Sequence, residues 1–470
     1  MRDLLLLGIL FAFIFASFRV PYFMALGYLW VDFLQPQRIG YYVFNQLPVA
    51  MILGVGALIT FLLFDKEKKL RFGLLQALVT LFVVYAVVAT YGWAVVPSGI
   101  EKLDSMSKAL LFSAFLPMIL TTRLRIEAAL AVILCSISAI TLSAGGKVLV
   151  GGGGYGASLF LVNNNTGLYE ASTLSTTALA LVPMLWWFYK HNSFVRASKF
   201  TLIITLGIIL SMCLVTIGAE ARTGLLSMGM LGFLLWLRSS KKIISGVALG
   251  VLLVGSIPFL PASFTERMST LETFNSDKSA STRIAVWKWT LDYVSENPFG
   301  GGFHIYKINN VTVEMSETTV EGNTTDRVDF SVKDRARAFH SAYFEVLGEL
   351  GIPGLAIWLS IVTGALYKAR AVVKRERKLV TPLLNTETGE EREMSDWARD
   401  FGRSMSITIL VYLTGALFVG IATQPTLYTM ISLLVSVWYL RSDHLANVIE
   451  RGRKASFKNA HIVRPSTVLA

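Results

Sequence analysis

The sequence has few charged residues, few cysteines and few histidines. Of its 470 residues, 16% are charged, whereas a soluble globular protein carries about 25%. The two cysteines, Cys135 and Cys213, both lie inside apolar runs. We therefore interpret them as packing residues, and neither a disulfide nor a cysteine metal site is expected. With only five histidines in the chain, the position of each one is informative.

Motifs that bind metals or nucleotides are also missing. The chain contains no HExxH, CxxC or DxD motif, and no carboxylate pair stands out as a glycosidase or metal site. The glycines around Lys147, in SAGGKVLVGGGGYG, do not match GxxxxGK[ST], because no Ser or Thr follows the lysine. We therefore reject a nucleotide-binding P-loop. Chemistry without a metal or another cofactor is the expectation.

Long apolar runs are what the sequence has in abundance. It is 54% hydrophobic, and many runs approach the ~20 residues that a helix needs to cross a bilayer core. This pattern predicts an all-α polytopic membrane protein. The arrangement of residues 1–36 stays open, either as one span plus a half-buried segment or as two short spans. The expected spans lie near 3–18 and/or 21–36, and at 43–64, 71–93, 105–120, 125–143, 168–189, 200–219, 221–237, 243–260, 341–367, 403–423 and 426–441.

The net charge of +12 reflects membrane topology and not nucleic-acid binding. Basic residues gather in short segments between apolar runs, which is typical of cytoplasmic loops under the positive-inside rule. A cytoplasmic N-terminus and a basic cytoplasmic tail then require an even number of spans, so we expect about twelve transmembrane helices. The basic segments are 65–71, 121–125, 190–199, 238–242 and 368–378.

The spans and loops divide the chain into four parts. The segment 261–339 carries eleven acidic and nine basic residues, so it lacks the cytoplasmic charge bias. It is too long for a simple connection, which predicts an ordered periplasmic subdomain. The four expected parts are an N-terminal transmembrane bundle (1–260), this subdomain (261–339), C-terminal transmembrane helices (340–441) with a charged cytoplasmic loop at 368–402, and a cytoplasmic tail (442–470).

His340 is the leading candidate for chemistry. It lies in RARAFHSAYFEVLGELG, where the long loop meets an apolar run. Of the five histidines, only His304 and His340 are expected to face the periplasm. A neutral imidazole can accept a proton near neutral pH. The alternative is a residue at a helix N-terminus that hydrogen-bonds a neighbouring loop.

Several cations are expected on the same side and suggest an anionic ligand. Arg222, in IGAEARTGLL, lies between two apolar runs, where an arginine is costly unless it is paired or serves a site. Glu220 could be its partner, or the guanidinium could bind phosphate oxygens. Arg283 begins a predicted amphipathic helix that ends at NPFGGG. Further candidates for substrate binding are Lys102, Lys147, Arg335 and Arg337.

Together these motifs resemble a known family. EARTG after a span, R-x-x-x-W followed by NPFGGG, and F-H before E-x-G-I-x-G (Glu349, Gly351, Ile352 and Gly354) resemble the O-antigen ligase and polymerase superfamily of bacterial inner membranes. MRDLLLLGIL and YLWVDFLQPQRIGY are similar to its O-glycosylation ligase subgroup. The family often has His-Asn at the loop exit, where this chain has His340-Ser341.

The resemblance implies a GT-C-like glycosyltransferase of the inner membrane, with its active site facing the periplasm. It would move a glycan from undecaprenyl pyrophosphate to lipid A-core, inverting the anomeric centre without a metal. His340 would be the base, and Arg222 and Arg283 would bind the diphosphate. An O-antigen polymerase or a protein O-glycosyl ligase would use the same donor. A lipid-linked glycan transporter is an alternative of another class, which would place functional charges at mid-membrane.

Overall fold

The structure is a computed structural model that describes residues 2–151, 159, 166–247, 250, 278–321, 324–383 and 389–462. The predicted span at 243–260 therefore lies largely outside the described residues. The glycine-rich stretch after Gly151 and Asn163 to Asn165 lie almost entirely outside them as well.

The apolar runs form helices, as their length and composition predict. Residues 1–36 contain two helices, and their arrangement as two short spans or as one span with a half-buried segment stays a prediction. The helices before the long loop are α1 (Arg2–Ser17), α2 (Phe23–Leu34), α3 (Pro36–Ile39), α4 (Val43–Gln46), α5 (Val49–Leu63), α6 (Leu74–Gly92), α7 (Gly99–Ile119), α8 (Arg123–Gly151), η2 (Gly167–Tyr169), α9 (Ala171–His191), α10 (Lys199–Gly218) and α11 (Arg222–Arg238).

The long loop and the C-terminal part contain the remaining elements. These are α14 (Lys278–Glu296), η4 (Ile305–Ile308), β1 (Asn310–Glu321), β2 (Thr324–Arg335), α15 (Ala342–Leu383), α16 (Gly389–Ala416) and α17 (Pro425–Ile462). The predicted helix that starts near Arg283 is present as α14, and it ends just before Asn297 and Pro298.

Several of these helices have the properties of membrane spans. Within the described ranges, five helices are long and apolar enough to cross a bilayer, and two shorter apolar helices, α2 and α5, accompany them. The chain is therefore a mainly helical protein with the composition of a polytopic membrane protein, and a total of twelve spans stays a prediction. The five candidates are Leu74–Gly92, Arg123–Gly151, Ala171–His191, Lys199–Gly218 and Ala342–Arg377.

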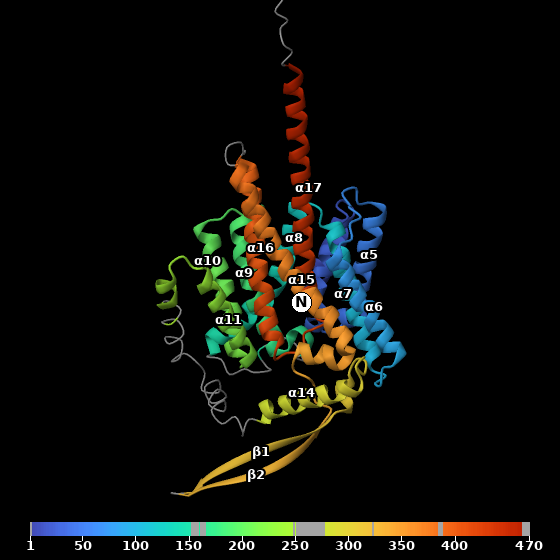
Figure 1. The fold of residues 1–470 in the computed structure, drawn as a ribbon, viewed down its shortest axis with the longest axis vertical. Coiled ribbons are helices and arrows are strands. Elements are labelled where there is room, and N and C mark those ends of the chain that lie inside the picture. The colour runs from blue at the N-terminus through green and yellow to red at the C-terminus, as the bar shows by residue number, and fades with distance from the viewer. Residues whose placement is uncertain are drawn as a thin grey trace, which may run out of the picture.

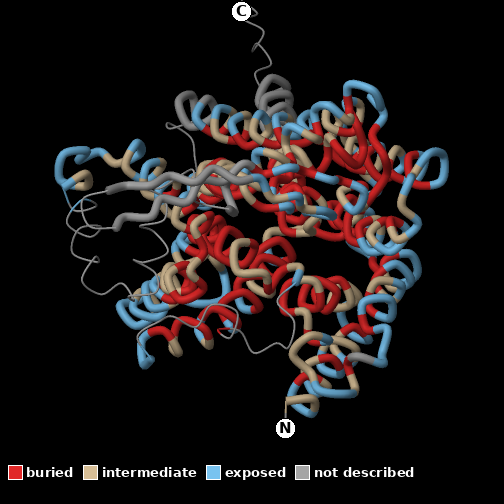
Figure 2. Tube along the Cα trace, turned by 90° about the horizontal axis from the view of Figure 1, so that it is seen from below, coloured by how far each residue is buried: buried red, intermediate tan, exposed pale blue. Residues whose placement is uncertain are grey.

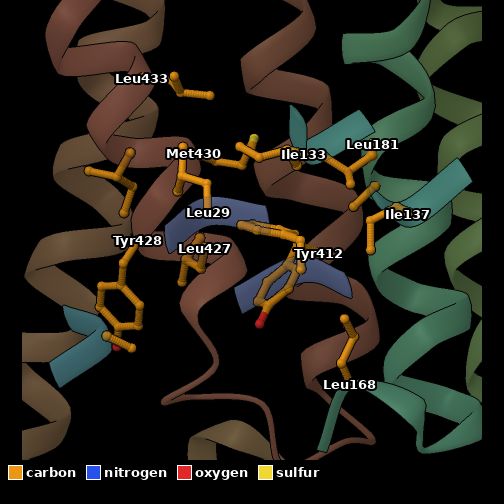
Figure 3. Close-up of a cluster of buried hydrophobic side chains, with 14 of the residues drawn as sticks. Leu29, Ile133, Ile137, Leu168, Leu181, Tyr412, Leu427, Tyr428, Met430 and Leu433 are labelled. Atoms are coloured by element: carbon orange, nitrogen blue, oxygen red, sulfur yellow. The ribbon is translucent and has the colours of Figure 1, made fainter. Parts of the chain in front are cut away.

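The centre of the bundle is a packed apolar core. Buried residues concentrate in the middle of the bundle, and exposed residues lie mainly on its outside (Figure 2). The core joins α2, α8, α9, α16 and α17 through side chains such as Leu29, Ile137 and Leu433, which are fully buried (Figure 3). Tyr412 and Tyr428 belong to this core, and each satisfies its buried hydroxyl with a backbone carbonyl.

The basic segments gather at one end of the bundle. Arg125 forms an ion pair with Asp65 at 2.7 Å, and Arg123 donates to the carbonyl of His191 at 2.9 Å. Arg71 pairs with Asp443 on α17. These contacts tie together segments that the positive-inside rule assigns to one side. Which compartment this end faces stays a prediction.

The opposite end carries α14 and a β-hairpin, below the bundle in Figure 1. β1 and β2 pair antiparallel, from Asn310 opposite Arg335 to Glu321 opposite Thr324. Val311 and Val313 pack with a buried residue of α14, Val286, in a small cluster separate from the main core. This sheet within 261–339 was not predicted from the sequence. Its signals are the apolar alternation in NVTV and VDFSV and the Gly-Asn dipeptide at 322–323.

Several helices continue past the apolar runs into segments that were predicted to connect the spans. α15 extends to Leu383 and α16 begins at Gly389, so most of the expected loop at 368–402 is helical. Here charged side chains pair across helices, as Arg441 does with the fully buried Glu376 at 2.7 Å. α17 likewise continues into the predicted tail, as far as Ile462. α8 also continues past the predicted span at 125–143, as far as Gly151.

Candidate functional site

A cavity of about 1040 Å³ lies where several helices end. Its lining comes from segments far apart in the sequence: Lys102 of α7, the turn between α10 and α11, α14, the approach to α15 and the loop between α16 and α17. Arg222, Arg283 and His340 all line it. The cavity therefore brings together the three residues that the sequence analysis ranked highest.

Arg222 lies at the cavity because a tight turn joins two apolar helices. α10 ends at Gly218, and Arg222 is the first residue of α11. The N-cap residue Ala221 has no side chain that could cap the helix. A half-buried guanidinium therefore lies beside a helix N-terminus, and both favour an anion. Glu220, which also lines the cavity, has a left-handed backbone with φ 52°, a strained conformation often found at functional sites.

Arg283 is held at the cavity by the packing of α14 on the start of α15. Trp287, one turn further along α14, donates its indole N–H to the carbonyl of Phe339 at 2.8 Å. The indole also stacks on Phe344, with ring centroids 4.9 Å apart. Trp287 thus fixes α14 against Phe339 and Phe344, which lie before and after His340 in the sequence.

His340 occupies a constrained position at the entrance to α15. It has φ 47°, a conformation that is unfavourable for a residue with a side chain. Its neighbours Phe339 and Ser341 are almost fully buried, while His340 itself is exposed to the cavity. The surrounding protein lowers the pKa of His340 below its usual value, and the nearby charge of Arg283 lowers it further. Glu170 acts in the opposite direction, and the neutral imidazole is favoured.

Glu170 is a cavity residue that the sequence analysis missed. It is the N-cap of α9, and its carboxylate accepts hydrogen bonds from the backbone of Ser172 at 3.1 Å and of Thr173 at 2.7 Å. This carboxylate is therefore fixed next to the cavity and cannot swing freely. A Glu before a Ser/Thr-rich apolar run was the available signal, because acidic and small polar residues favour helix N-termini.

The other predicted cations have different surroundings. Lys102 lines the cavity, but its ammonium lies 2.6 Å from carboxylate oxygens of both Glu345 and Glu349. Lys147 donates to the carbonyl of Leu159 at 3.0 Å and does not line the cavity.

Arg335 and Arg337 also lie outside the cavity lining. Arg335 is the exposed last residue of β2. Arg337 is exposed too, and its guanidinium forms an ion pair with Asp334 at 2.6 Å. Both residues lie close to His340 in the sequence, but Arg335 belongs to the β-hairpin and Arg337 to the segment that directly follows it.

The motifs NPFGGG and E-x-G-I-x-G interlock. Gly351 interrupts α15 with φ 65° and ψ −167°. Across this interruption, Gly301 donates to the carbonyl of Gly348 at 3.0 Å and Gly302 to that of Glu349 at 2.9 Å. Ile352 donates back to the carbonyl of Pro298 at 2.9 Å. The glycine turn is therefore bonded to the break in α15, which follows the part of α15 that lines the cavity.

His304, the second predicted periplasmic histidine, lies outside the cavity lining. It is the N-cap of η4, and its Nδ1 lies 3.3 Å from the hydroxyl of Ser98. In the described part of the chain, no group of three or more His, Cys, Asp or Glu side chains is arranged to hold a metal ion.

Comparison with known proteins gives two matches that together cover most of the chain. Residues 1–193 match a family described as a family of unknown function (DUF5935). Residues 206–359 match a family described as O-Antigen ligase, and this range contains Arg222, Arg283 and His340. No curated protein matches the chain. The match at residues 206–359 supports the resemblance to the O-antigen ligase family that is seen in the motifs of the chain.

Proposed function

We propose that the protein is an O-antigen ligase that transfers a glycan from undecaprenyl pyrophosphate to a sugar hydroxyl of lipid A-core. The transfer takes place on the periplasmic side of the inner membrane, inverts the anomeric centre and needs no metal. The observation that carries this proposal is the convergence of Arg222, Arg283 and His340 on one cavity. An anion-binding pair and a base are what this reaction needs.

In the proposed reaction, the acceptor hydroxyl loses its proton to His340. Its oxygen attacks the anomeric carbon from the side opposite the diphosphate. The bond from that carbon to the diphosphate oxygen breaks, and the diphosphate leaves with the electron pair. Attack from the opposite side inverts the anomeric centre. The leaving diphosphate gains negative charge, which Arg222 and Arg283 stabilise.

The neutral state of His340 supports the role of base. An imidazole that is already protonated cannot accept the hydroxyl proton. Desolvation by the surrounding protein and the nearby charge of Arg283 both lower the pKa of His340, so the neutral form prevails at pH 7. Arg283, which would bind the donor, thus also favours the neutral form of His340 that can accept a proton.

The position of the cavity favours an enzyme over a transporter. Arg222 begins α11, and His340 lies two residues before α15. The charges proposed for function therefore lie at helix ends, whereas a transporter binds its substrate near the bilayer midplane. Proteoliposomes with the lipid-linked glycan, assayed with and without an acceptor, test this choice. Transport of the donor across the membrane without an acceptor would contradict the proposal of an enzyme.

The acceptor is tested by supplying alternatives. Purified protein is incubated with an undecaprenyl-diphosphate glycan and, in separate reactions, with lipid A-core, a second lipid-linked glycan or a hydroxyl-bearing protein. We expect modification of lipid A-core. Extension of the second glycan would instead identify a polymerase, and modification of the protein would identify a protein O-glycosyl ligase.

A further inference from the structure

Three charged side chains form a buried cluster in the wall of the cavity. The ammonium of Lys102, on α7, lies 2.6 Å from Oε1 of Glu345 and 2.6 Å from Oε2 of Glu349. The two glutamates are one turn apart on α15. The exposed fractions of the three side chains are 16%, 10% and 2%. We call Lys102, Glu345 and Glu349 the α7–α15 charge cluster.

The remaining carboxylate oxygens of the cluster hold backbone amides. Oε1 of Glu349 accepts the N–H of His304 at 3.0 Å. Oε2 of Glu345 accepts the N–H of Ala422 at 3.3 Å. Hydrogen bonds from backbone N–H groups to a carboxylate are stronger than those to neutral acceptors. The cluster therefore joins α7 and α15 to two loops.

Both loops contribute to the cavity wall. His304 leads into η4, whose Tyr306 lines the cavity, and Ala422 lies in the loop between α16 and α17, whose Phe418 and Gly420 line it. This second loop is also anchored by the core, because the hydroxyl of Tyr428 donates to the carbonyl of Ala422 at 2.7 Å. The loop is therefore held through both backbone polar groups of Ala422, its N–H and its carbonyl.

The cluster also fixes the start of α15, close to His340. The backbone N–H of Glu345 donates to the carbonyl of Ser341 at 2.8 Å, which closes the first turn of the helix. Ser341 directly follows His340. When Lys102 holds Glu345, it therefore also holds the turn that sets the position of the His340 backbone.

We propose that Lys102, Glu345 and Glu349 are positioning residues. They set the place of His340 and of the cavity wall, and Lys102 does not bind the donor diphosphate directly. Two carboxylates already surround its ammonium, and the cluster carries a formal charge of −1, which does not attract an anion. A buried charge cluster with its hydrogen bonds satisfied is rigid. This proposal rests on the proposed function for its kinetic test only.

The kinetic test separates positioning from direct binding. We expect Lys102→Met to lower kcat at least tenfold and to change KM for the donor less than threefold, because misplacing a base slows the chemical step. The matched control is Lys108→Met on the same helix, whose partner Asp104 forms an exposed pair. It should keep wild-type kcat and KM. A tenfold higher KM for Lys102→Met with unchanged kcat would overturn the proposal in favour of direct donor contact.

A second test needs no transfer activity. Amide hydrogen exchange is measured at His304 and Ala422 in wild-type and variant protein. We expect at least tenfold faster exchange at both amides in Lys102→Met, because Glu345 and Glu349 lose the ammonium that holds them together. Wild-type exchange at both would overturn positioning, even if no glycan transfer is found.

A neutral variant covers the case in which Lys102→Met does not fold. Lys102→Met combined with Glu345→Gln and Glu349→Gln leaves no unpaired buried charge, and replacing a whole buried ion cluster is often tolerated. We expect this variant to fold, with exchange at His304 and Ala422 still faster than wild type, because neutral amide acceptors bind less strongly. Wild-type exchange together with wild-type kcat in the neutral variant would overturn the proposal.

Discussion

Gly300 and Gly351 meet backbone to backbone: a Cβ atom on Gly300 would lie 2.5 Å from the amide nitrogen of Gly351. Both glycines have positive φ, 78° and 65°. Their contact joins the turn after α14 to the break in α15, and so connects the two helices that carry Arg283 and the residues after His340. The glycines of two separate motifs thus serve one contact.

Replacing Gly351 should therefore destabilise the protein. In Gly351→Ala the new Cβ would lie 2.3 Å from the carbonyl oxygen of Pro298, and the positive φ alone costs about 1–3 kcal/mol for a non-glycine residue. We expect a clearly lower midpoint of thermal unfolding in detergent. The control is Gly229→Ala on α11, where a Cβ meets nothing within 4 Å. Equal midpoints for the two variants would contradict the described contact.

Arg222→Ala should weaken binding of the donor diphosphate and slow transfer. Removing one charged group that stabilises a developing anion typically costs about 10²–10³-fold in rate. The measurements are binding of undecaprenyl diphosphate and the transfer rate. Arg196→Ala, at an exposed arginine in the 190–199 segment, is the control. If Arg222→Ala matches this control in affinity and rate, Arg222 has no role in donor binding.

Arg337→Ala should have a much smaller effect than Arg222→Ala. Its guanidinium is exposed and pairs with Asp334 outside the cavity lining, and an exposed ion pair contributes little. We expect the rate to stay within about threefold of wild type. A loss as large as that of Arg222→Ala would show that the substrate reaches beyond the cavity, to the base of the hairpin.

The rate should fall as the pH drops through the lowered pKa of His340. His340 has a lowered pKa and must be neutral to act as base, so activity is retained above this pKa and is lost as the pH falls through it. Arg283→Gln removes a charge that lowers the pKa of His340, so the acid limb of the kcat profile should move to higher pH. An unchanged acid limb would show that the pH dependence does not come from the titration of His340.

Chelation should leave the activity intact. The proposed reaction uses arginines where many glycosyltransferases use a metal ion, so transfer in excess EDTA should equal transfer without it. Restoration of lost activity by Mg²⁺ or Mn²⁺ would contradict the metal-independent reaction.

The helices were predictable from the sequence because the signal for a span is local. The predicted spans at 71–93 and 200–219 are apolar enough to be recognised without knowledge of any contact, and they correspond to α6 and α10. The helical extensions past these runs were not predictable in the same way. Glu376 is charged, yet it is fully buried, because Arg441 reaches it from 65 residues away in the sequence.

The sequence indicated Arg222 and His340 as candidate site residues, but it did not indicate the contacts among the charged residues of the cavity wall. These two residues could be recognised because a charge or a rare histidine at the end of an apolar run can be seen in the sequence alone. Glu345 and Glu349 were visible too, as two acids one turn apart in an apolar helix, but their partner Lys102 is 243 and 247 residues away. From the sequence, Lys102 was therefore predicted to bind an anion. Only the three-dimensional structure shows that it lies between two carboxylates.

The most direct test of the account is the turnover of His340→Asn. Asparagine tolerates the left-handed backbone of this position better than alanine does, so the loss of the imidazole is measured without added strain. The matched control is His304→Asn, at the other left-handed histidine, φ 63°, which lies outside the cavity lining. Transfer to lipid A-core is measured with saturating donor.

If His340 is the base, His340→Asn loses about 10²–10⁴-fold in kcat and still binds the donor, while His304→Asn retains near wild-type turnover. If His340→Asn also turns over at near the wild-type rate, His340 does not accept the proton, and the central claim is contradicted.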